Sequence, residues 1–409
     1  MALGNILVGQ SGGPTAVINS SLAGVYETAK ALGAPHVYGM QFGIEGLLQG
    51  KLVEMDPLFA DPLQIELLKR TPSSFLGSCR CKLPAPAQDE RPYQTLFALF
   101  AQYKISAVFY IGGNDSMDTV AKLSGYCKSH GVADIQVIGG PKTIDNDLCG
   151  IDHCPGFGSA AKYIATVFSE LEREITVYEA KNVIIVEMMG RNAGWLTAAA
   201  ALAQGRNGSV PYLIYLEESP FSMERFVKDI KDRLEKHDAV LVAVSEGAHD
   251  ETGQFICEQG QGAKELDVFG HNKLSGTGKV LEEVVKEQIG CKVRSIELNL
   301  LQRCASHIMS RTDIEESGKL GENAVALAVA GESGKMSTLT RVSDEPYEVS
   351  YSGVDISQVA NLEKKIPASW INEEGNGVTE ELIAYLKPLV QGEISSVYED
   401  GIPKYLLLK

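Results

Sequence analysis

The stretch ISAVFYIGGNDSMDTV, residues 105–120, joins an apolar run, a pair of glycines and the beginning of a helical pattern. The run from Ile105 to Ile111 predicts a strand buried on both faces, because a strand with one face in water would alternate polar and apolar residues. Gly112-Gly113 then leads into a helix predicted from about Met117 to His130. A buried strand, a glycine turn and a covering helix form the unit from which parallel sheets are built.

The same unit recurs along the rest of the chain. Further buried strands are predicted at residues 5–8, 135–138, 183–186, 212–216, 239–244 and 293–298. Helices are predicted at about residues 15–32, 193–204, 223–237, 279–289 and 323–330. This alternation predicts an α/β protein with enough strands for two parallel sheets, each covered by helices on both faces. Residues 248–278 are expected to form a long functional or inserted loop, and the segment beyond about residue 345 has a mixed pattern.

The composition is that of a folded globular protein. Of the 409 residues, 44% are hydrophobic and 22% are charged, and the length allows two or three domains. The formal net charge of −16 argues against nucleic acid or an anionic membrane as a partner, since no basic run offsets it. Phosphate ligands would need cations concentrated locally, from Arg, Lys, helix N-termini or a metal ion.

The sequence offers no pattern for export or for crossing a membrane. Residues 1–5 run directly into a predicted strand, and no apolar stretch reaches the roughly 18 residues that a membrane span needs. The 8 cysteines include one close pair, Cys79 and Cys81, which does not match a zinc-binding pattern. A cytoplasmic protein with free thiols is expected.

Three predicted strands end in paired glycines, namely Gly12-Gly13, Gly112-Gly113 and Gly139-Gly140. In an open parallel sheet the ligand lies beyond the carboxyl ends of the strands. Glycine allows the backbone to approach that ligand closely, and the helix N-terminus that follows attracts an anion. One such turn could be a plain tight turn, whereas three in one chain favour a phosphate-binding site.

The third glycine turn continues into a polar stretch, Pro141-Lys142-Thr143-Ile144-Asp145-Asn146-Asp147. Two acids and an Asn within three residues are unfavourable in both helices and strands. At a strand end, such carboxylates could hold Mg²⁺ or take a proton from a hydroxyl. The alternative is a solvated turn in which the side chains bond to local backbone.

The stretch from Pro141 to Asp147 resembles a signature of the phosphofructokinase family. Other blocks that resemble this family, in the family's order, are SGGP at 11–14, GGNDS at 112–116, MGRNAGW at 189–195, SEG at 245–247 and LQR at 301–303. The resemblance runs from about residue 5 to about residue 340. The second glycine turn alone would be unspecific, because related lipid and NAD kinases share it, but the blocks together are highly specific.

The resemblance implies a phosphofructokinase-like α/β fold of two three-layer αβα domains with mostly parallel sheets and the active site in the cleft between them. Residues 1–155, with about 304–345, would form the donor domain, and residues 156–303, with about 346–409, the fructose 6-phosphate domain. The implied reaction transfers a phosphoryl group to the 1-hydroxyl of fructose 6-phosphate with Mg²⁺ as cofactor. A homodimer or homotetramer is implied, since in this family an arginine of the sugar site often comes from a neighbouring subunit.

The same resemblance implies roles for residues around the polar turn. Asp145 resembles the general base that removes the proton from the sugar 1-hydroxyl, and Thr143 would lie beside that hydroxyl. Asp147 resembles a metal-side or orienting carboxylate. Arg191 resembles the arginine that stabilises the transferring phosphoryl group. These parts suffice in principle, because phosphoryl transfer depends mostly on positioning and charge neutralisation.

Further matched residues would bind the two substrates. For the sugar, Met189 and Gly190 would line the site, and Glu246 would accept hydrogen bonds from its hydroxyls. Fork-shaped arginine donors suit phosphate, and Arg294 and Arg303 resemble the pair that clamps the 6-phosphate. On the donor side, Arg80 resembles a phosphate contact, and Gly13 would press its backbone against the donor. The alternative for each of these arginines is an ion pair on the protein surface, which is the usual role of an arginine outside such matched blocks.

Two positions indicate the phosphoryl donor. Members of the family that use ATP resemble one another in having glycine where this chain has Asp115 and Lys142. The Asp115 carboxylate would occupy and repel the space of an α-phosphate, which disfavours ATP, and Lys142 could reach pyrophosphate. Both residues resemble the pyrophosphate-dependent branch, in which the reaction is reversible. In the alternative, Lys142 merely pairs with Asp115 and the donor is ATP.

A third possibility is a non-catalytic regulatory subunit that binds sugar phosphates. Loss of the base would be expected in such a protein, whereas Asp145 is present. Members with an allosteric effector site have arginines on the first helix, where this chain has Ala23 and Glu27, so no such site is predicted.

Some positions depart from the family pattern. Asn114 replaces an Asp that binds Mg²⁺, and its amide oxygen could still coordinate the ion together with Asp147. In the alternative, Asp115 and Asp147 hold the ion. Asn182 stands where bacterial ATP-dependent enzymes have an intersubunit arginine. Leu300 replaces a His or Tyr three residues before Arg303. These differences concern details of the predicted sugar and metal sites rather than their location.

Overall fold

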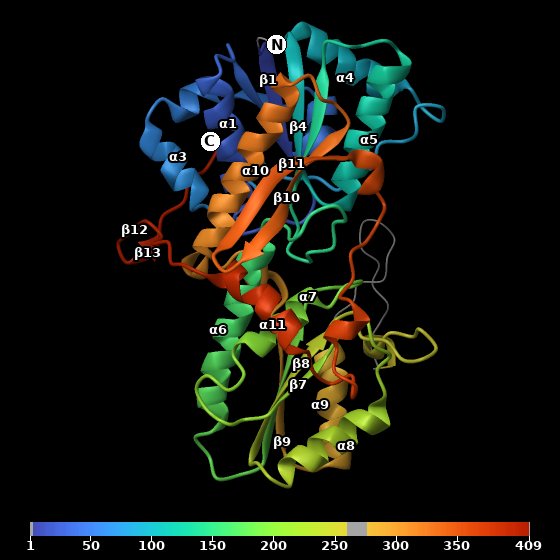
Figure 1. The fold of residues 1–409 in the computed structure, drawn as a ribbon, viewed down its shortest axis with the longest axis vertical. Helices are drawn as coiled ribbons and strands as arrows, with labels where there is room; N and C mark the ends of the chain where they lie inside the picture. Colours follow the sequence, from blue (N-terminus) through green and yellow to red (C-terminus); the bar gives the residue numbers. More distant parts are fainter. Residues whose placement is uncertain (1–2, 260–275, 409) are drawn as a thin grey trace.

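The computed structural model describes residues 3–259 and 276–408. The chain forms two domains, each built around its own β-sheet (Figure 1). Residues 248–278 were expected to form a long loop, and positions 260–275 of this range lie outside the described residues. The described part contains η3 (Ile256–Gln259) and a bridge between His249 and Phe255, and residues 277–278 already belong to a helix.

The first domain contains a seven-stranded sheet in the order β11-β10-β5-β4-β1-β2-β3. Neighbours from β10 to β2 pair in parallel, and antiparallel strands flank them at both edges. The strands are β1 (Asn5–Gln10), β2 (Val37–Met40), β3 (Leu52–Glu54), β4 (Ile105–Gly112), β5 (Gln136–Pro141), β10 (Lys335–Asp344) and β11 (Tyr347–Asp355).

Helices cover both faces of this sheet. In β1, Leu7 packs into the cluster formed with α4 (Arg91–Gln102) and α5 (Asn114–Ser129). Its neighbour Ile6 points to the other face, toward α1 (Ile18–Ala31) and α10 (Arg311–Val329). Successive side chains of a strand point to opposite faces, so a continuous apolar strand serves two cores. The smaller helices of this domain are α2 (Gly43–Leu48), η1 (Asp56–Phe59) and α3 (Pro62–Lys69).

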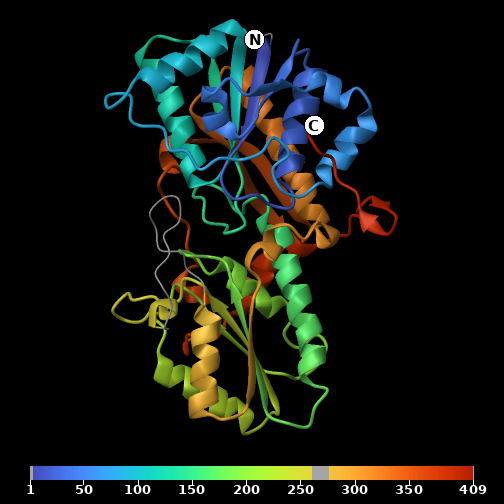
Figure 2. The same cartoon turned by 180° about the vertical axis from the view of Figure 1, so that it is seen from behind.

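The second domain contains an all-parallel sheet in the order β7-β8-β6-β9. Its strands are β6 (Asn182–Met188), β7 (Tyr212–Tyr215), β8 (Ala239–Ser245) and β9 (Lys292–Glu297). In β6, Ile184 packs toward α6 (Phe157–Ile175), and Ile185 packs toward α8 (Met223–Leu234) and α9 (Thr277–Gln288). Both views show α6 running from the junction of the domains along this sheet (Figures 1 and 2). Two three-layer αβα domains with mostly parallel sheets are therefore confirmed.

The C-terminal segment does not belong to one domain, which corrects the predicted boundary at residue 346. Strand β11 pairs with β10 and extends the first sheet. Residues Ile366, Leu382, Leu386 and Leu389 then pack into the core of the second domain. Leu406 and Leu408 return to the core of the first domain, where Figure 1 marks the C-terminus. Because β11 forms a hairpin with β10, the local pairing decides its domain.

This C-terminal segment and the connections contain short elements. They are α11 (Glu380–Leu386), β12 (Tyr398–Glu399), β13 (Ile402–Pro403), η4 (Asn299–Arg303), η5 (Ser306–Ile308), η6 (Ile356–Gln358), η7 (Ala368–Trp370) and η8 (Lys387–Val390). No helix within the described residues has both the length and the apolar character needed to cross a membrane.

Two predicted helices differ from the structure. The helix expected at 193–204 is a single α-turn, α7 (Trp195–Ala198), followed by η2 (Ala199–Leu202). The run expected at 323–330 is the end of α10, which begins at Arg311 after a cap in which the side chain of Ser310 accepts a hydrogen bond from Asp313 N–H. The first turns of α10 were missed because they contain Gly318 and Gly321, which disfavour an isolated helix.

These glycines allow α1 and α10 to lie very close together. A Cβ atom on Gly24 would lie 2.1 Å from the carbonyl oxygen of Gly318, and one on Gly321 would lie 2.3 Å from that of Ser21. Both distances are shorter than any real Cβ contact, so the close approach of the two helices requires glycine.

We predict that Gly24→Ala lowers the free energy of unfolding by about 1–3 kcal/mol, because the added methyl group forces the helices apart. Gly125→Ala is the matched control, since Gly125 lies in α5 and a Cβ there would meet nothing within 4 Å. The control should gain about 0.5–1 kcal/mol from helix propensity. Chemical denaturation measures both. Equal stabilities for the two variants would contradict the inferred packing of α1 on α10.

Candidate active site

A cleft of about 520 Å³ lies where the two domains meet. Such a volume is typical of small-molecule sites. Its walls come from turns after β1, β4 and β5 of the first sheet and from the ends of β6, β8 and β9 of the second. The lining residues are Ser11, Gly12, Gly13, Pro14, Cys79, Arg80, Cys81, Asp115, Lys142, Thr143, Ile144, Asp145, Glu187, Met188, Met189, Arg191, Glu246, Glu297, Asn299, Leu300 and Arg303.

The ends of β1, β4 and β5 lie side by side, because these strands are neighbours in the first sheet. The turn predicted at Gly139-Gly140 is wrong, since both glycines lie within β5 and pair with Tyr110 and Ile111 of β4, and the chain leaves the strand only after Pro141. Ser11 N–H donates to Ile111 O at 2.9 Å, and Lys142 N–H donates to Gly112 O at 3.0 Å. The segment that precedes Arg80 docks on the first turn through a hydrogen bond from Gly12 N–H to Cys79 O at 3.1 Å. The structure thus brings residues far apart in sequence to one edge of the sheet, as predicted for strand ends.

The polar turn Thr143–Asp147 follows β5 directly and is largely buried. Asn146 is fully buried, has a left-handed backbone with φ of 55°, and accepts a hydrogen bond from Cys154 N–H at 2.9 Å. Thr143 Oγ1 accepts from Asp145 N–H at 3.1 Å. Asn146 is inaccessible to water and Thr143 is only 8% exposed, whereas Asp145 and Asp147 are partly exposed, so the turn is not the fully solvated one of the alternative.

Both carboxylates of the turn are held in an environment that disfavours charge. Burial raises the pKa of Asp145, although Lys142 and Arg303 nearby act in the opposite direction. Burial and the neighbouring Asp145 charge raise the pKa of Asp147 to about 7. Asp145 lines the cleft, whereas Asp147 lies beside it. A cation or a proton-donating ligand would relieve this unfavourable burial of like charges.

Lys142 is only 3% exposed, and its Nζ donates to Gly13 O at 2.5 Å. Burial, together with the positive charges of Arg303 and Arg80, lowers the pKa of Lys142 to about 8. Asp115 pairs instead with Lys82, with 3.0 Å between Nζ and Oδ1. The alternative in which Lys142 pairs with Asp115 is therefore not the arrangement in the structure.

Arg303 reaches from η4 of the second domain to the first glycine turn. A Cβ atom on Gly13 would lie 2.8 Å from Arg303 Nη1, so a larger residue at position 13 would clash with the guanidinium in this position. Burial and the charge of Arg80 lower the pKa of Arg303. Although the sequence predicted a sugar-phosphate contact for Arg303, its guanidinium lies close to the donor turn. Several cations converge here in a protein of net charge −16, which suits an anionic ligand.

The wall from the second domain is acidic. Burial and the charge of Asp145 raise the pKa of Glu246 to about 8, and Glu246 Oε1 accepts from Gly190 N–H at 3.3 Å. Burial raises the pKa of Glu187 to about 7, although its carboxylate accepts hydrogen bonds from Gly276 and Gly278 N–H at 3.1 and 2.7 Å. These carboxyl groups could accept hydrogen bonds from a polyhydroxylated ligand.

Sequence reasoning missed some polar residues of this wall, namely Glu187, Glu297 and Asn299. A charged residue at the end of an otherwise apolar strand is a usable signal. Glu187 follows the apolar run of β6, and Glu297 ends β9. Their contribution could have been expected from the rule that ligands lie beyond the carboxyl ends of parallel strands.

Four predicted residues do not line the cleft. Gly190 lies just behind it, bonded to Glu246. Asn114 begins α5, and its Oδ1 is buried without a hydrogen-bond partner among the described residues. Arg294 is exposed in the middle of β9, the edge strand of its sheet, so this chain's cleft does not receive it. Asp147 lies beside the cleft, two residues after Asp145.

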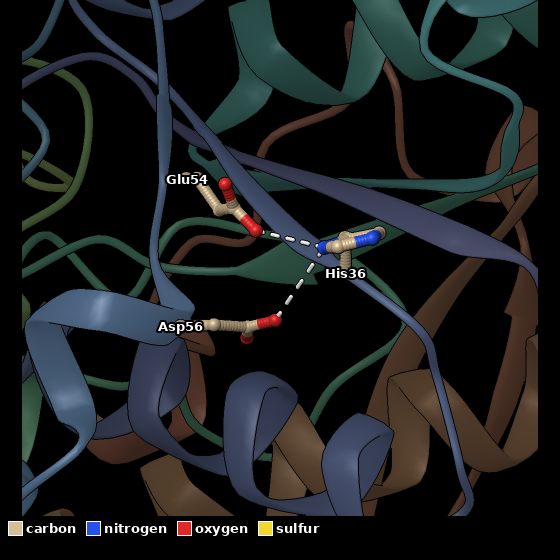
Figure 3. A group of neighbouring side chains, drawn as sticks. All are labelled: His36, Glu54 and Asp56. Carbon is tan, nitrogen blue, oxygen red and sulfur yellow. Dashed lines mark hydrogen bonds and ion pairs between the residues drawn. The ribbon is translucent and has the colours of Figure 1, made fainter.

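A separate group of titratable side chains lies at the amino end of β2 (Figure 3). His36 Nδ1 lies 2.7 Å from Glu54 Oε1 and 3.9 Å from Asp56 Oδ2. Lys30 Nζ lies 3.0 Å from the same Asp56 oxygen, so an ammonium group already compensates that carboxylate. We interpret this group as a surface ion-pair cluster, apart from the cleft.

Comparison with known proteins agrees with the fold. The family model described as phosphofructokinase matches residues 5–328, and the chain belongs to this family. A pyrophosphate--fructose 6-phosphate 1-phosphotransferase of Xanthomonas campestris is 40% identical, over 100% of this chain and 97% of that protein. The enzyme of that name from Methylococcus capsulatus is 38% identical, over 100% and 96%.

A solved structure supports the same grouping. The pyrophosphate-dependent phosphofructokinase from Nitrosospira multiformis superposes with a TM-score of 0.89 at 37% sequence identity. The match covers 99% of this chain and 96% of that one. The likeness therefore includes the C-terminal segment from which the sequence pattern predicted little.

The raised pKa of Glu246 predicts a pH-dependent stability in the absence of ligand. Because the folded-state pKa lies above that of an unfolded Glu, the folded protein is favoured at low pH. This contribution is lost as the pH rises through about 8. Glu246→Gln cannot ionise, so its free energy of unfolding should fall less between pH 5.5 and 8.5, by at least about 1 kcal/mol. Denaturant unfolding at the two pH values measures this, and parallel losses would contradict the assignment.

Proposed function

We propose that this chain is a pyrophosphate-dependent phosphofructokinase. It transfers a phosphoryl group from pyrophosphate to the 1-hydroxyl of fructose 6-phosphate, and the reverse reaction uses fructose 1,6-bisphosphate and phosphate. One observation carries the choice of donor: buried Lys142 contacts the first glycine turn, with Asp115 at the same end of the cleft. The names of the full-length relatives agree with this choice.

Asp145 is proposed as the general base that removes the proton of the 1-hydroxyl. It lines the cleft, and burial raises its pKa, which brings the basicity of its carboxylate closer to what proton abstraction near neutral pH requires. Thr143 would lie beside the same hydroxyl. Arg191, which also lines the cleft, would neutralise charge on the phosphoryl group during transfer. Met189, Gly190 and Glu246 would hold the sugar.

The donor end would hold pyrophosphate through cations. Lys142, Arg80 and the backbone of Gly13 surround this end, and Arg303 lies close enough to contact a phosphate at the same place. A longer donor would have to pass Asp115, whose side chain is about half exposed toward solvent. Like charges disfavour the α-phosphate of ATP there, even though Lys82 partly compensates the carboxylate.

Mg²⁺ is the proposed cofactor, and the local residues fit a hard cation. Asn114 presents a buried amide oxygen without a hydrogen-bond partner among the described residues, and burial beside Asp145 raises the pKa of Asp147. Oxygen ligands of this kind suit Mg²⁺. We propose that Asn114 and Asp147 hold the ion, directly or through water. When bound, it would neutralise charge on the phosphates.

A homodimer or homotetramer is also proposed. Arg294 points to solvent from edge strand β9, so a 6-phosphate contact by this residue requires the site of a neighbouring copy. Within one chain, Arg303 is the cleft-lining member of the predicted arginine pair. A cytoplasmic location is consistent with these phosphorylated substrates.

A donor comparison tests the proposed function. With Mg²⁺ and fructose 6-phosphate, the purified protein should form fructose 1,6-bisphosphate with pyrophosphate and at least about a hundredfold more slowly with ATP, as a difference of about 3 kcal/mol would give. Replacing Asp115→Gly and Lys142→Gly together should abolish most pyrophosphate activity and allow some with ATP. Activity of the wild type with ATP alone would overturn the proposal in favour of an ATP-dependent enzyme.

Substitution of the proposed base gives an independent prediction. Asp145→Asn should lower kcat by about 10²–10⁴-fold, because the amide cannot accept the proton. The KM values should change only a few-fold if the group acts mainly in the transition state. Steady-state kinetics measures both, with Asp232→Asn on the outer face of α8 as the control of matched chemistry. An unchanged kcat for Asp145→Asn would reject the assignment.

A further inference from the structure

Asn146 holds the polar turn in place through its side chain. Its amide oxygen accepts from Cys154 N–H and from Lys364 Nζ, at 2.9 and 3.2 Å. Its amide nitrogen donates to the hydroxyl oxygen of Tyr385 at 3.0 Å. Asn146 separates Asp145 from Asp147 in the sequence. The orientation of both carboxylates therefore depends on bonds made to a residue between them.

Lys364 comes from the C-terminal segment and contacts the turn with both backbone and side chain. Its N–H donates to Asp147 O at 2.7 Å. Its Nζ donates to Asp152 O at 2.7 Å and to Ile151 O at 3.3 Å, in addition to Asn146. The three donors of one ammonium group thus meet three oxygen acceptors. Next to it, Glu363 forms an isolated antiparallel bridge with Leu148.

The same segment is attached to the loop of the second domain that contains Arg191. Asn192 Nδ2 donates to Glu363 Oε1 at 2.6 Å, and Trp195 Nε1 donates to Lys364 O at 3.0 Å. Ile366 N–H donates to Glu218 Oε1 at 3.0 Å, and the Glu218 carboxylate also accepts from Gly194 N–H. Residues 363–366 therefore bond to both sides of the cleft within four consecutive positions.

We infer that residues 363–366 form a strap that sets the distance and orientation between the two loops of the active site, with Lys364 as the main positioning residue. The inference rests on the proposed function for its catalytic consequence. Residues 363–366 lie beyond residue 328, where the match to the family model ends. The loop on one side contains Asp145, the proposed base, and the loop on the other contains Arg191, the proposed phosphoryl contact.

Small displacements at this place should have large effects on rate. Reacting groups must approach within about 3–3.5 Å in the correct orientation, so a shift of about 1 Å can cost a hundredfold. The strap bonds to the backbone of Asp147 and to the side chains of Asn146 and Asn192, which lie near the proposed catalytic groups. None of residues 363–366 lines the cleft itself. Loss of the strap should therefore lower kcat much more than it weakens substrate binding.

Lys364→Met tests this inference, because methionine keeps the length of the side chain and the backbone bond to Asp147 while it removes all three donors. We expect kcat to fall about 10- to 100-fold, with KM for both substrates within about threefold of wild type. Lys228→Met, which removes an exposed lysine of α8, should retain wild-type kinetics. Tyr385→Phe, a mild change that removes the hydroxyl bound to Asn146, should lower kcat about 3- to 10-fold.

Two further measurements separate positioning from general stability. In Lys364→Met, hydrogen exchange at the amides of residues 147–154 should accelerate about tenfold or more, while exchange in β6 and β8 stays unchanged. The double variant of Lys364 and Tyr385 should lose less activity than the product of the single losses, since both act through Asn146.

The inference is overturned if folded Lys364→Met keeps wild-type kcat and wild-type exchange at residues 147–154. It is also overturned if both substitutions raise exchange uniformly across the chain, which would indicate global destabilisation. A wild-type protein without pyrophosphate activity would refute the proposed function, and the exchange experiment would still decide whether the strap orders the turn.

Discussion

The left-handed backbone at Asn146 is the local constraint on which the active site depends. An L-residue rarely adopts this conformation, and Asn tolerates it better than most because its short amide can bond nearby. Here the amide is fully buried, so each of its polar atoms needs a partner inside the protein. Those partners come from Cys154, Tyr385 and Lys364. The shape of one turn thus requires segments that are more than 200 residues apart in the sequence.

A second constraint is the burial of charge. The protein is acidic overall, but burial, together with the positive charges of neighbouring cations, lowers the pKa values of Lys142 and Arg303. Without a ligand these groups are costly to hold together, because burial penalises each charge and like charges repel. An anionic ligand would reverse both effects. Burial also disfavours the charged form of carboxyl groups on the opposite wall, such as Glu246. Hydrogen bonds from the hydroxyl groups of a ligand would stabilise these carboxylates.

The cleft exists because two sheets present their carboxyl edges to one another. Chain connectivity reinforces this arrangement, since α6 leads from the first domain into the second and the C-terminal segment crosses back. Leu382 and Leu386 anchor that segment in the second core, while Leu406 and Leu408 end it in the first. The two domains are therefore tied by several crossings, and residues 363–366 bond to loops on both sides of the cleft.

The sequence by itself determined the fold class, the strands β1 and β4 to β9, and part of the cleft lining. Apolar runs such as 105–111 require burial on both faces, and glycines at their ends require a close approach of backbone or ligand. These are local consequences of the sequence pattern, and together with the resemblance to the phosphofructokinase family they place Lys142, Asp145 and Asp115 at one edge of a sheet.

Tertiary structure decided what depends on distant partners. The sequence could not show that β11 pairs with β10, that Asp115 pairs with Lys82, or that Arg294 faces solvent. Nor could it show that the segment beyond residue 345 supports the polar turn, because Lys364 and Asn146 are far apart in the sequence and only the tertiary fold brings them into contact. The periodicity of apolar residues in the sequence indicates which side of a helix or strand is buried. The hydrogen-bond partner of a buried polar group depends instead on how the whole chain packs.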